Sequence, residues 1–454
     1  MKTVFLAGGI GKRMFPLMED KFLFKFLGKT LLEHHMETAA SNGLDDFIVI
    51  GNPENIEKIK SAIEVNKILE GKKYRINYSI QKKPDGMADA LMAAKDLIAG
   101  EEIVIVSPND VFDKSAYAAL MSAAKNADAD SYILGQEVTE YFPGGYLIVD
   151  EKNYMKWIVE KPGKGNEPSN LVNIVVHYHR KTKELFEYLE STKSASDDVY
   201  ESSIDKMIKD GFKFKVVRYT GAWKAIKYPW HMLEMTKHFL NGVKSPMIHG
   251  TAKIAASAII EGGVIIDAGA RVMENAVVKG PCYIGRNSII GNNSLVRENT
   301  HIGDNSVVGF STEVKNSYIG DNCWFHTAYV GDCIIADNCS LAAGTIVTNV
   351  RLDEKDIKVN VFGKGDMSSG LDYLGVIMGE NCRTGSNVTL MPGVRVGPNS
   401  IVGPGVVLRE DLEPNKLIYT KQEQVIKENN VLPNSKKKEE IMRKLVKLEE
   451  NRKT

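Results

Sequence analysis

The sequence lacks an excess of charge of either sign. Its 454 residues include 58 Lys and Arg and 58 Asp and Glu, so the formal net charge is zero. A balanced chain has no electrostatic field to hold a nucleic acid or a membrane surface, and we expect neither partner. Small anionic ligands stay possible. The length predicts two or three domains.

Long apolar runs and paired cysteines are also missing. No stretch reaches the ~18 apolar residues of a membrane span, and the opening segment has only a short apolar run without a small-residue cleavage site. We therefore expect a soluble, cytoplasmic protein. The cysteines stand at repeat positions rather than in C-x-x-C pairs, which favours reduced core or turn residues over zinc ligands or disulfides: Cys282, Cys323, Cys333, Cys339 and Cys382.

What the sequence does have is a six-residue repeat. Ile or Val occupies every sixth position from Ile254 to Val314. An α-helix would need a period of 3.6 and an isolated strand a period of 2, whereas one short strand plus one turn per repeat fits six. Gly, Asn and Asp between the aliphatic positions suit such turns. The pattern predicts a parallel β-helix that is interrupted over residues 349–375 and resumes from Met378 to Leu408.

A glycine-rich segment follows the first predicted strand. Residues 2–7 read as a buried strand, and glycines occupy positions 8, 9 and 11. Glycines let backbone N–H groups approach phosphate oxygens, so this turn is a candidate phosphate cradle. It fits neither of two better-known loops. A dinucleotide fingerprint needs Gly where Met14 stands, and a P-loop needs Ser or Thr where Arg13 stands.

The segment fits another pattern, L-A-[AG]-G-x-G-x-R-[ML], from Leu6 to Met14. By this motif, roughly the first half of the chain resembles the sugar-1-phosphate nucleotidylyltransferases. The resemblance implies an α/β domain with a doubly wound, mostly parallel sheet and ligands at the carboxyl ends of its strands. It also assigns roles: nucleotide binding to Leu6, Gly8, Gly9, Gly11, Gln81 and Gly86; sugar-phosphate binding to Gly145, Glu160, Lys161 and Asn173; Mg²⁺ binding to Asp110; and catalysis to Arg13 and Lys21.

These residue types suit nucleotidyl transfer. In that reaction a sugar-1-phosphate oxygen attacks the α-phosphorus of a nucleoside triphosphate and expels pyrophosphate. The obstacle is negative charge, which Arg13 and Lys21 would neutralise while Mg²⁺ on Asp110 clamps the phosphates.

Positions in the same predicted pocket depart from the family pattern. The family's second metal ligand stands in W-x-D-[VI]-G-x-P-W, where this chain has Ala225 for the Asp and Lys227 for the Gly. Val175 replaces the Gly expected after Asn173. Two interpretations follow. Either Lys227 supplies positive charge and a single Mg²⁺ suffices, or this half is a degenerate binding or regulatory module.

The repeat region carries a histidine that could do chemistry. His326 could take a proton from an amine that attacks an acyl thioester, although on the residues alone a surface or trimer-contact histidine is the more common case. The surrounding order E-V-K, H-x-x-Y-x-G-D, A-G-T-I and Asn resembles the acetyltransferase half of the bifunctional glucosamine-1-phosphate acetyltransferase / N-acetylglucosamine-1-phosphate uridylyltransferases, in their archaeal-type branch.

This second resemblance implies a left-handed β-helix of hexapeptide repeats, a homotrimer, and acetyl-CoA and glucosamine-1-phosphate as substrates. It makes His326 the general base, and it gives the sugar phosphate a set of binding residues: Arg297, Lys315, Tyr329, Asn349, Lys355 and Lys358. Residues 350–374 are expected to leave the coil and reach the acetyl-CoA site.

The whole sequence therefore predicts an α/β domain at 1–243, a linker at 244–253, a β-helix at 254–412 and a tail at 413–454 with a capping or trimer-edge helix at 436–452. The leading hypothesis is a bifunctional enzyme of UDP-N-acetylhexosamine synthesis, with UTP the favoured nucleotide among UTP, dTTP, ATP and GTP, and galactosamine phosphate open beside glucosamine phosphate. One alternative is an active acetyltransferase fused to a degenerate nucleotidyltransferase-like domain. Another is a sugar nucleotidylyltransferase whose β-helix only oligomerises.

Overall fold

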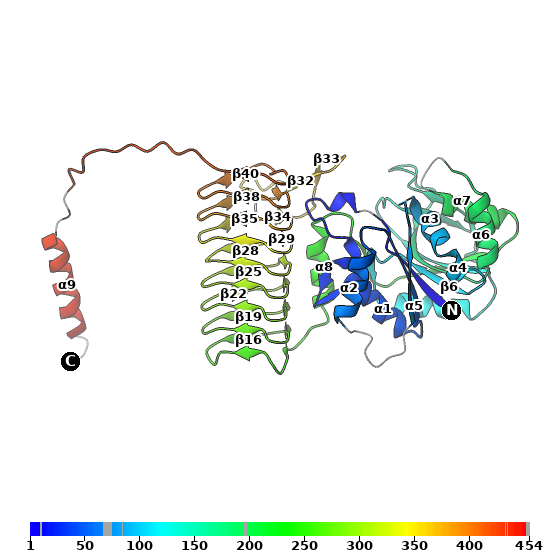
Figure 1. Cartoon of the computed structure of the whole chain (residues 1–454), viewed down its shortest axis with the longest axis horizontal. Coiled ribbons are helices and arrows are strands. Elements are labelled where there is room, and N and C mark those ends of the chain that lie inside the picture. Colours follow the sequence, from blue (N-terminus) through cyan, green and yellow to red (C-terminus); the bar gives the residue numbers. More distant parts are fainter. Residues whose placement is uncertain are drawn as a thin grey trace. The chain divides into compact units, whose positions relative to one another are not determined.

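The computed structural model describes residues 1–9, 11–66, 75–83, 85–194, 198–431, 433 and 435–450. Met1–Tyr419 form one compact unit and Thr420–Thr454 a second (Figure 1). Ile10 of the predicted phosphate loop, the side chain of Leu448 and the last residues of the predicted tail helix lie outside the described part.

The N-terminal half is built on a mixed sheet. Its path runs β10-β9-β11-β6-β1-β4-β5, with β8 joining β11 to β12. The central strands β5, β4, β1 and β6 are parallel, and β11 runs antiparallel to β6. The strands are β1 (Lys2–Leu6), β4 (Asp46–Gly51), β5 (Arg75–Ile80), β6 (Ile103–Val106), β8 (Ser131–Glu137), β9 (Gly145–Val149), β10 (Met155–Glu160), β11 (Leu171–His179) and β12 (Phe214–Arg218).

Helices alternate with these strands, as the sequence predicts. Buried apolar strands such as β4 and β6 need cover on both faces, and the helices supply it. The first helix begins at a capping box, in which Thr30 and Glu33 satisfy each other's backbone N–H groups. The helices are α1 (Leu31–Ala40), α2 (Ile56–Asn66), α3 (Gly86–Ala93), α4 (Lys95–Ile98), α5 (Ser115–Ala124), α6 (Thr182–Ser191), α7 (Val199–Lys209) and α8 (His231–Leu240), with short 3₁₀ turns η1 (Lys12–Met14) and η2 (Lys21–Leu23). Short strands complete this half: β2 (Lys25–Phe26), β3 (Lys29–Thr30), β7 (Asp110–Phe112) and β13 (Trp223–Ala225).

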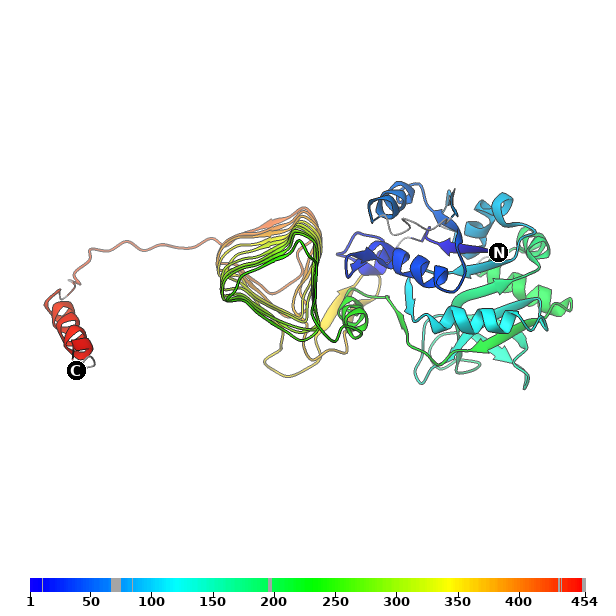
Figure 2. The ribbon, with the colours of Figure 1, turned by 90° about the horizontal axis from the view of Figure 1, so that it is seen from below.

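The second half is a parallel β-helix of triangular cross-section (Figure 2). The first face holds β14 (Met247–Ile248), β17 (Val264–Ile266), β20 (Cys282–Ile284), β23 (Thr300–Ile302), β26 (Tyr318–Ile319), β29 (Ile334–Ile335), β34 (Ile377–Met378) and β37 (Arg395–Val396). The second face holds β15 (Lys253–Ile254), β18 (Arg271–Val272), β21 (Ile289–Ile290), β24 (Val307–Val308), β27 (Trp324–Phe325), β30 (Ser340–Leu341), β35 (Arg383–Thr384), β38 (Ile401–Val402) and β40 (Leu417–Ile418). The third face holds β16 (Ile259–Glu261), β19 (Val277–Lys279), β22 (Leu295–Val296), β25 (Glu313–Lys315), β28 (Tyr329–Gly331), β31 (Ile346–Val347), β36 (Thr389–Leu390) and β39 (Val407–Leu408).

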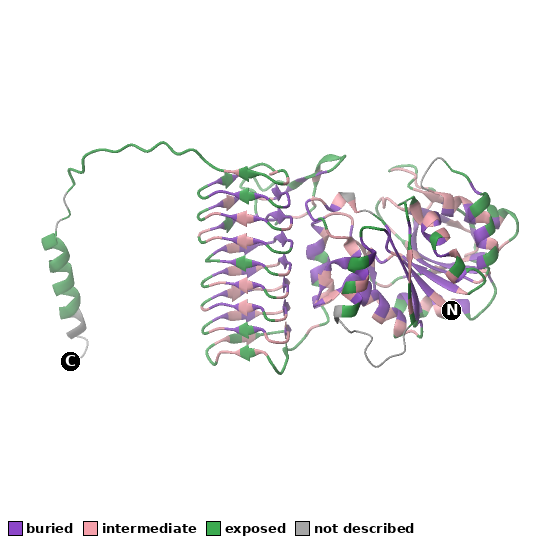
Figure 3. Cartoon of the chain, in the orientation of Figure 1, coloured by how far each residue is buried: buried purple, intermediate pink, exposed green. Residues whose placement is uncertain are grey.

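The six-residue period has the predicted physical meaning. From Ile266 to Val314 the aliphatic residue of each repeat is buried in the core of the coil, and Ile254 and Ile260 are partly buried against it (Figure 3). The five cysteines are free and also buried there, which matches their expected role as core residues. Pairing starts inside the range expected to be linker, because β14 already pairs with β17, and it continues to β40 beyond residue 412.

The break in the repeat is an excursion that folds as a hairpin of β32 (Lys358–Val361) and β33 (Gly365–Ser368). Val359 and Val361 are buried in a cluster with Ile226 and Trp230 of the N-terminal half. The Nζ atom of Lys364 donates a hydrogen bond to the hydroxyl of Tyr228 (3.2 Å). Within this chain the excursion therefore packs on the N-terminal half.

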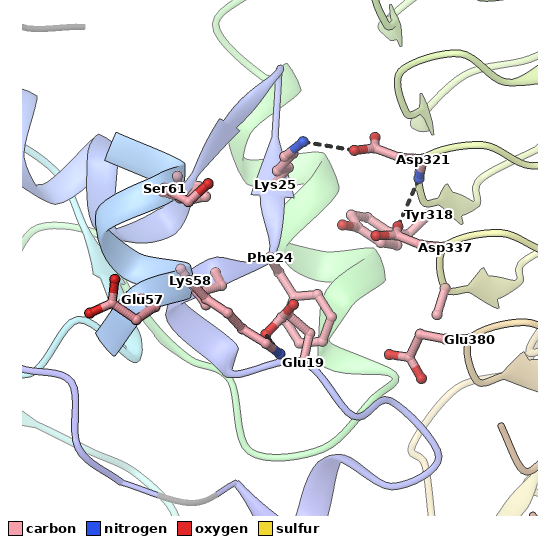
Figure 4. A pocket seen from close by; sticks show the side chains of 14 residues that line it. Glu19, Phe24, Lys25, Glu57, Lys58, Ser61, Tyr318, Asp321, Asp337 and Glu380 are labelled. Atoms are coloured by element: carbon pink, nitrogen blue, oxygen red, sulfur yellow. Dashed lines mark hydrogen bonds and ion pairs between the residues drawn. The ribbon is translucent and has the colours of Figure 1, made fainter. Parts of the chain in front are cut away.

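The first face of the coil carries the contact with the N-terminal half. Tyr283, His301 and Tyr318 stack on successive turns, with ring centroids 4.9 and 5.0 Å apart. Phe26 packs on Tyr318 at 5.7 Å. Beside this stack Lys25 forms an ion pair with Asp321 (2.7 Å), and both residues line a cavity of about 590 Å³ (Figure 4). The two halves thus share one apolar junction with a charged edge.

The tail carries helix α9 (Ser435–Glu450), where the sequence predicts a helix. Its apolar residues Ile441, Met442, Leu445 and Val446 are exposed. In the described part of the chain, no helix has the length and apolar character needed to cross a membrane.

One corner of the coil holds an unusual residue. Most corners place Asn in the left-handed region, for example Asn305 at φ 55°. Asn tolerates this conformation better than most residues because its side chain can bond locally. Thr327, next to His326, occupies the same kind of position at φ 43° although it is β-branched. The backbone beside His326 is therefore strained.

We predict that Thr327→Asn raises the free energy of unfolding by about 1 kcal/mol, because it relieves this strain. The reverse change at an equivalent corner, Asn305→Thr, should lower it by a similar amount. Thermal unfolding midpoints of the two variants check this pair. No gain for Thr327→Asn together with no loss for Asn305→Thr would show that the corners carry no strain.

Candidate functional site

The predicted nucleotide loop is shaped by two side chains from neighbouring strands. The buried side chain of Gln81 lies against Gly8 and donates from Nε2 to the carbonyl of Gly86 (3.0 Å). A Cβ at Gly8 would overlap Oε1 of Gln81 and lie 3.3 Å from its Cδ. Asn52 donates to the carbonyl of Gly8 (3.1 Å). Gly9, in contrast, faces open space. The side chain of Gln81 thus fills the space beside Gly8, while the space beside Gly9 is free of protein atoms within 4 Å.

Cations gather where the loop ends. Burial and, to a smaller extent, the nearby Arg13 lower the pKa of Lys21 to about 8, while Asp110 opposes the shift. Burial also lowers the pKa of Lys227 to about 7, with Asp110 opposing and Arg13 and Lys21 adding to the shift. The Lys227 ammonium lies over the ring of Phe142, 3.0 Å from its centroid. This concentration of positive charge suits a polyphosphate.

Asp110 faces these cations from the start of β7. Burial raises its pKa, while Trp223, Lys227 and Lys21 act in the opposite direction. The indole N–H of Trp223 donates to its Oδ2 (3.0 Å). Strand β13 runs antiparallel to β7 and sets Ala225 directly opposite Asp110. The position of the family's second carboxylate is therefore adjacent to the first, and here it carries a methyl group.

The donor set limits what metal could bind. The described residues contain no cluster of three His, Cys, Asp or Glu side chains able to hold an ion. Magnesium does not require one, since it often binds through a single carboxylate plus substrate phosphates and water. The residues present fit that one-carboxylate arrangement at Asp110.

A cavity of about 610 Å³ opens beside Asp110. It is lined by residues from separate strands and helices, most of which the sequence predicts to bind the sugar phosphate or nucleotide: Gly86, Asp110, Gly145, Glu160, Lys161 and Asn173. Glu160 and Lys161 form an ion pair (2.8 Å). A Cβ at Gly145 would lie 3.0 Å from Oε2 of Glu160, so glycine is needed to leave the carboxylate its place. Val175, Phe142 and Lys227 also line this cavity, which we call the sugar-side cavity.

A second group of predicted residues meets on the third face of the coil. Lys315 forms an ion pair with the buried Asp332 (3.0 Å). Asn316 donates to the other oxygen of Asp332 (2.6 Å), and Asn349 donates to Oδ2. Asn349 also lies 3.5 Å from the hydroxyl of Tyr329. One carboxylate therefore organises a cation and two amides on successive turns.

Other predicted acetyltransferase residues stand apart from this group. Arg297 is next to Lys315 in register, but its guanidinium binds Glu313 (3.1 Å). His326 is exposed, at the corner between the second and third faces. Lys355 and Lys358 lie on the excursion, and within the described chain no hydrogen bond or ion pair joins either of them to Asp332 or Tyr329; Lys355 pairs with Asp353 instead (4.0 Å). Among the described residues, Lys315, Tyr329 and Asn349 are the predicted acetyltransferase residues that meet around Asp332 within one chain.

Sequence reasoning missed Asp332 as an organising residue, although it ends the H-x-x-Y-x-G-D motif. The signal was its position: corners of this coil favour Asn, and Asp332 has φ 55°. Tyr373 was missed as well. It lies under the Lys315 ammonium at 5.0 Å, and it comes from the excursion, whose path the repeat does not predict.

Known proteins match both halves. Residues 2–226 match the nucleotidyl transferase family model, and residues 281–316 and 375–410 match the bacterial transferase hexapeptide model. The chain is 37% identical to the bifunctional protein GlmU of Methanococcus maripaludis strain C7 over 94% of this chain and 99% of that protein. The chain belongs to the bifunctional GlmU family.

Other members of the family give the same match. GlmU of Methanocaldococcus jannaschii is 33% identical over 94% of this chain and 99% of its own length. The bifunctional sugar-1-phosphate nucleotidylyltransferase/acetyltransferase of Sulfurisphaera tokodaii is 32% identical, covering 91% and 98%.

Membership of the GlmU family makes the chain a transferase with a nucleotidyltransferase half and an acetyltransferase half. The predicted fold is confirmed as well: a nucleotidyltransferase α/β domain followed by a left-handed β-helix of hexapeptide repeats. The site residues remain predictions from the motifs and from the geometry described above.

The different surroundings of Gly8 and Gly9 lead to a paired prediction. Gly8→Ala should displace Gln81, break its bond to Gly86, and lower the free energy of unfolding by about 1 kcal/mol. Gly9→Ala should leave the unfolding midpoint unchanged, because its methyl group meets open space. Both variants should weaken binding of a nucleoside triphosphate, measured by calorimetric titration. Equal unfolding midpoints for the two variants would contradict the role given to Gln81.

Proposed function

We propose that this chain catalyses Mg²⁺-dependent transfer of a nucleotidyl group, from UTP in the first instance, to a sugar-1-phosphate, and acetylation of glucosamine-1-phosphate by acetyl-CoA. The observation that carries the first activity is the convergence of Gly86, Asp110, Gly145, Glu160 and Asn173 on the sugar-side cavity. These residues come from different elements spread along the domain, and ligands of open α/β sheets bind at such strand ends.

In the nucleotidyl half, side chains of this protein would neutralise the charge of the phosphates and orient the sugar. Arg13 and Lys21 would neutralise the triphosphate and the leaving pyrophosphate, and Glu160 and Asn173 would orient the sugar. Asp110 would hold Mg²⁺, whose chemistry there is to polarise phosphoryl oxygens. Lys227 adds a cation on the side where a second carboxylate is missing. This supports transfer with one metal-binding carboxylate.

In the acetyl half, His326 would take the proton that the attacking amine loses, since a neutral imidazole has a ring nitrogen that can accept it. Lys315 and Arg297 would bind the phosphate, with Asn349 and Tyr329 beside them. We propose a homotrimer. Support comes from Phe310 and Trp324, which leave 58% and 51% of their surface exposed close to the His326 corner, because exposed apolar side chains mark subunit contacts. A neighbouring subunit would then bring groups such as Lys355 or Lys358 toward the site.

A second candidate is an active acetyltransferase fused to a nucleotide-sugar binding module that no longer turns over. The specific observation in its favour is Ala225 opposite Asp110, because it leaves one carboxylate where the family has two. The two candidates differ in whether pyrophosphate is released.

For the nucleotidyl half, Asp110→Asn should slow pyrophosphate release from UTP and N-acetylglucosamine-1-phosphate about 10²-fold, because the carboxylate that holds the metal loses its charge. A coupled pyrophosphate assay measures this. Release of CoA should stay at the wild-type rate, which serves as the folding control. No pyrophosphate from the wild type with any nucleotide and sugar phosphate would favour the binding module instead.

For the acetyl half, His326→Ala should slow CoA release from acetyl-CoA and glucosamine-1-phosphate by about 10² to 10⁴ fold, the usual contribution of a general base. A thiol reagent follows the reaction, and pyrophosphate release is the matched control. A parallel loss of both activities would point to lost assembly rather than lost chemistry, and an unimpaired rate would remove His326 from the mechanism.

A further inference from the structure

A chain of buried polar side chains leads away from the sugar-side cavity. Asn173 lines the cavity, and its Oδ1 lies 2.7 Å from Nε2 of His177. Nδ1 of His177 lies 2.7 Å from the hydroxyl of Tyr200, which is 2.8 Å from Nε2 of His179. Nδ1 of His179 lies 2.8 Å from Oγ of Ser131. All five side chains are buried.

The fold brings these groups together through an irregularity. Asn173, His177 and His179 all belong to β11, and four residues of a regular strand would separate the first two widely. The register of β11 against β8 shifts between Ile174 and His177, which shortens the strand locally. Helix α7 then supplies Tyr200, whose ring stacks on His177 with centroids 5.7 Å apart.

The hydrogen atoms in this chain can be counted. Burial lowers the pKa of His177 well below its ordinary value and that of His179 to about 3, so each ring is neutral with one N–H. The Oδ1 of Asn173 can only accept, so His177 donates from Nε2 and accepts at Nδ1. Tyr200 must donate to that nitrogen, His179 must donate from Nε2 to the Tyr200 oxygen, and Ser131 must donate to Nδ1 of His179.

This direction of donation satisfies each of the four hydrogen bonds that join the five side chains. The opposite direction would also satisfy the two rings, but the hydroxyl hydrogen of Ser131 would then have no acceptor among these five side chains. It would also require the amide of Asn173 to turn over and present its oxygen to the cavity. The chain therefore couples the tautomers of two histidines to the face that Asn173 shows a ligand.

We propose that His177, Tyr200 and His179 are positioning residues that hold the amide of Asn173 with its NH₂ group toward the sugar-side cavity. Held in this way, Asn173 offers only donors. A hydroxyl or carbonyl oxygen of a sugar phosphate can accept them, and a protonated amine cannot. The proposal rests on the proposed nucleotidyl transfer to a sugar-1-phosphate for its kinetic consequence, although not for its hydrogen-bond pattern.

A matched pair of variants tests the kinetic consequence. His177→Phe keeps a ring against Tyr200 but cannot donate to Asn173, and it should raise KM for the sugar-1-phosphate about tenfold. His177→Gln can donate from its amide nitrogen and accept at its oxygen, so it should stay within about threefold of the wild type. KM for the nucleoside triphosphate should change less than about twofold in both. Equal rises for the two variants, or a matching rise in KM for the triphosphate, would overturn the proposal in favour of a merely structural role.

A second measurement needs no turnover, so it stands even where pyrophosphate release fails or His177→Phe does not fold. In ¹⁵N-histidine spectra of the wild-type protein, His177 and His179 should both show the neutral form protonated at Nε2, with assignments from His177→Gln and His179→Gln. Either ring protonated at Nδ1 instead would reverse the chain and overturn the orientation of Asn173. Absence of pyrophosphate with the expected tautomers would remove the proposed activity and leave the hydrogen-bond chain intact.

Discussion

The stacking of equivalent positions on successive turns is the constraint on which the rest of the molecule depends. Because β-strands pair in register along each of the three faces, one residue type repeated every six positions becomes a column on every face of the coil. Inward columns of Ile and Val form the core. Outward columns do not have to be apolar, so different columns carry residues with different roles. The stack of Tyr283, His301 and Tyr318 holds the N-terminal half, and the column of Asn316, Asp332 and Asn349 gathers polar groups around Lys315.

In the N-terminal half the corresponding constraint is charge balance at the strand ends. Asp110 carries the only carboxylate of the β7–β13 pair, and Ala225 faces it across the ladder. Three cations lie close enough to one another to shift pKa values beside Asp110: Arg13, Lys21 and Lys227. With a triphosphate bound, such an excess of cations is favourable. Without one it is costly, which is why burial and mutual repulsion lower the pKa of both lysines.

The sequence predicted features that depend on local patterns or on motifs. Eleven aliphatic residues at six-residue intervals, from Ile254 to Val314, were enough to predict the β-helix. The glycine-rich motif predicted the nucleotidyltransferase domain that holds both Gly8 and Asp110. It could not predict the network behind Asn173, because that depends on a register shift in β11 and on Tyr200 from a distant helix. It also could not predict where the excursion packs. A segment without the repeat carries no periodic signal, and its burial is decided by the apolar surface it meets, here Ile226 and Trp230.

The junction between the halves reaches the nucleotide loop itself. The chain that follows η1 is held by the coil: Arg395 lies over the ring of Phe15 at 5.2 Å, and Glu380 accepts a hydrogen bond from the backbone N–H of Met18 (2.9 Å). A Cβ at Gly379 would lie 2.6 Å from the carbonyl of Pro16, so the two backbones touch. Residues 15–18 lie between Arg13 and Lys21 in the chain, so a contact that fixes them also restricts both cations. The coil is therefore part of the framework of the predicted nucleotidyl site as well as the carrier of the predicted acetyl site, and this gives a physical reason for the two activities to share one polypeptide.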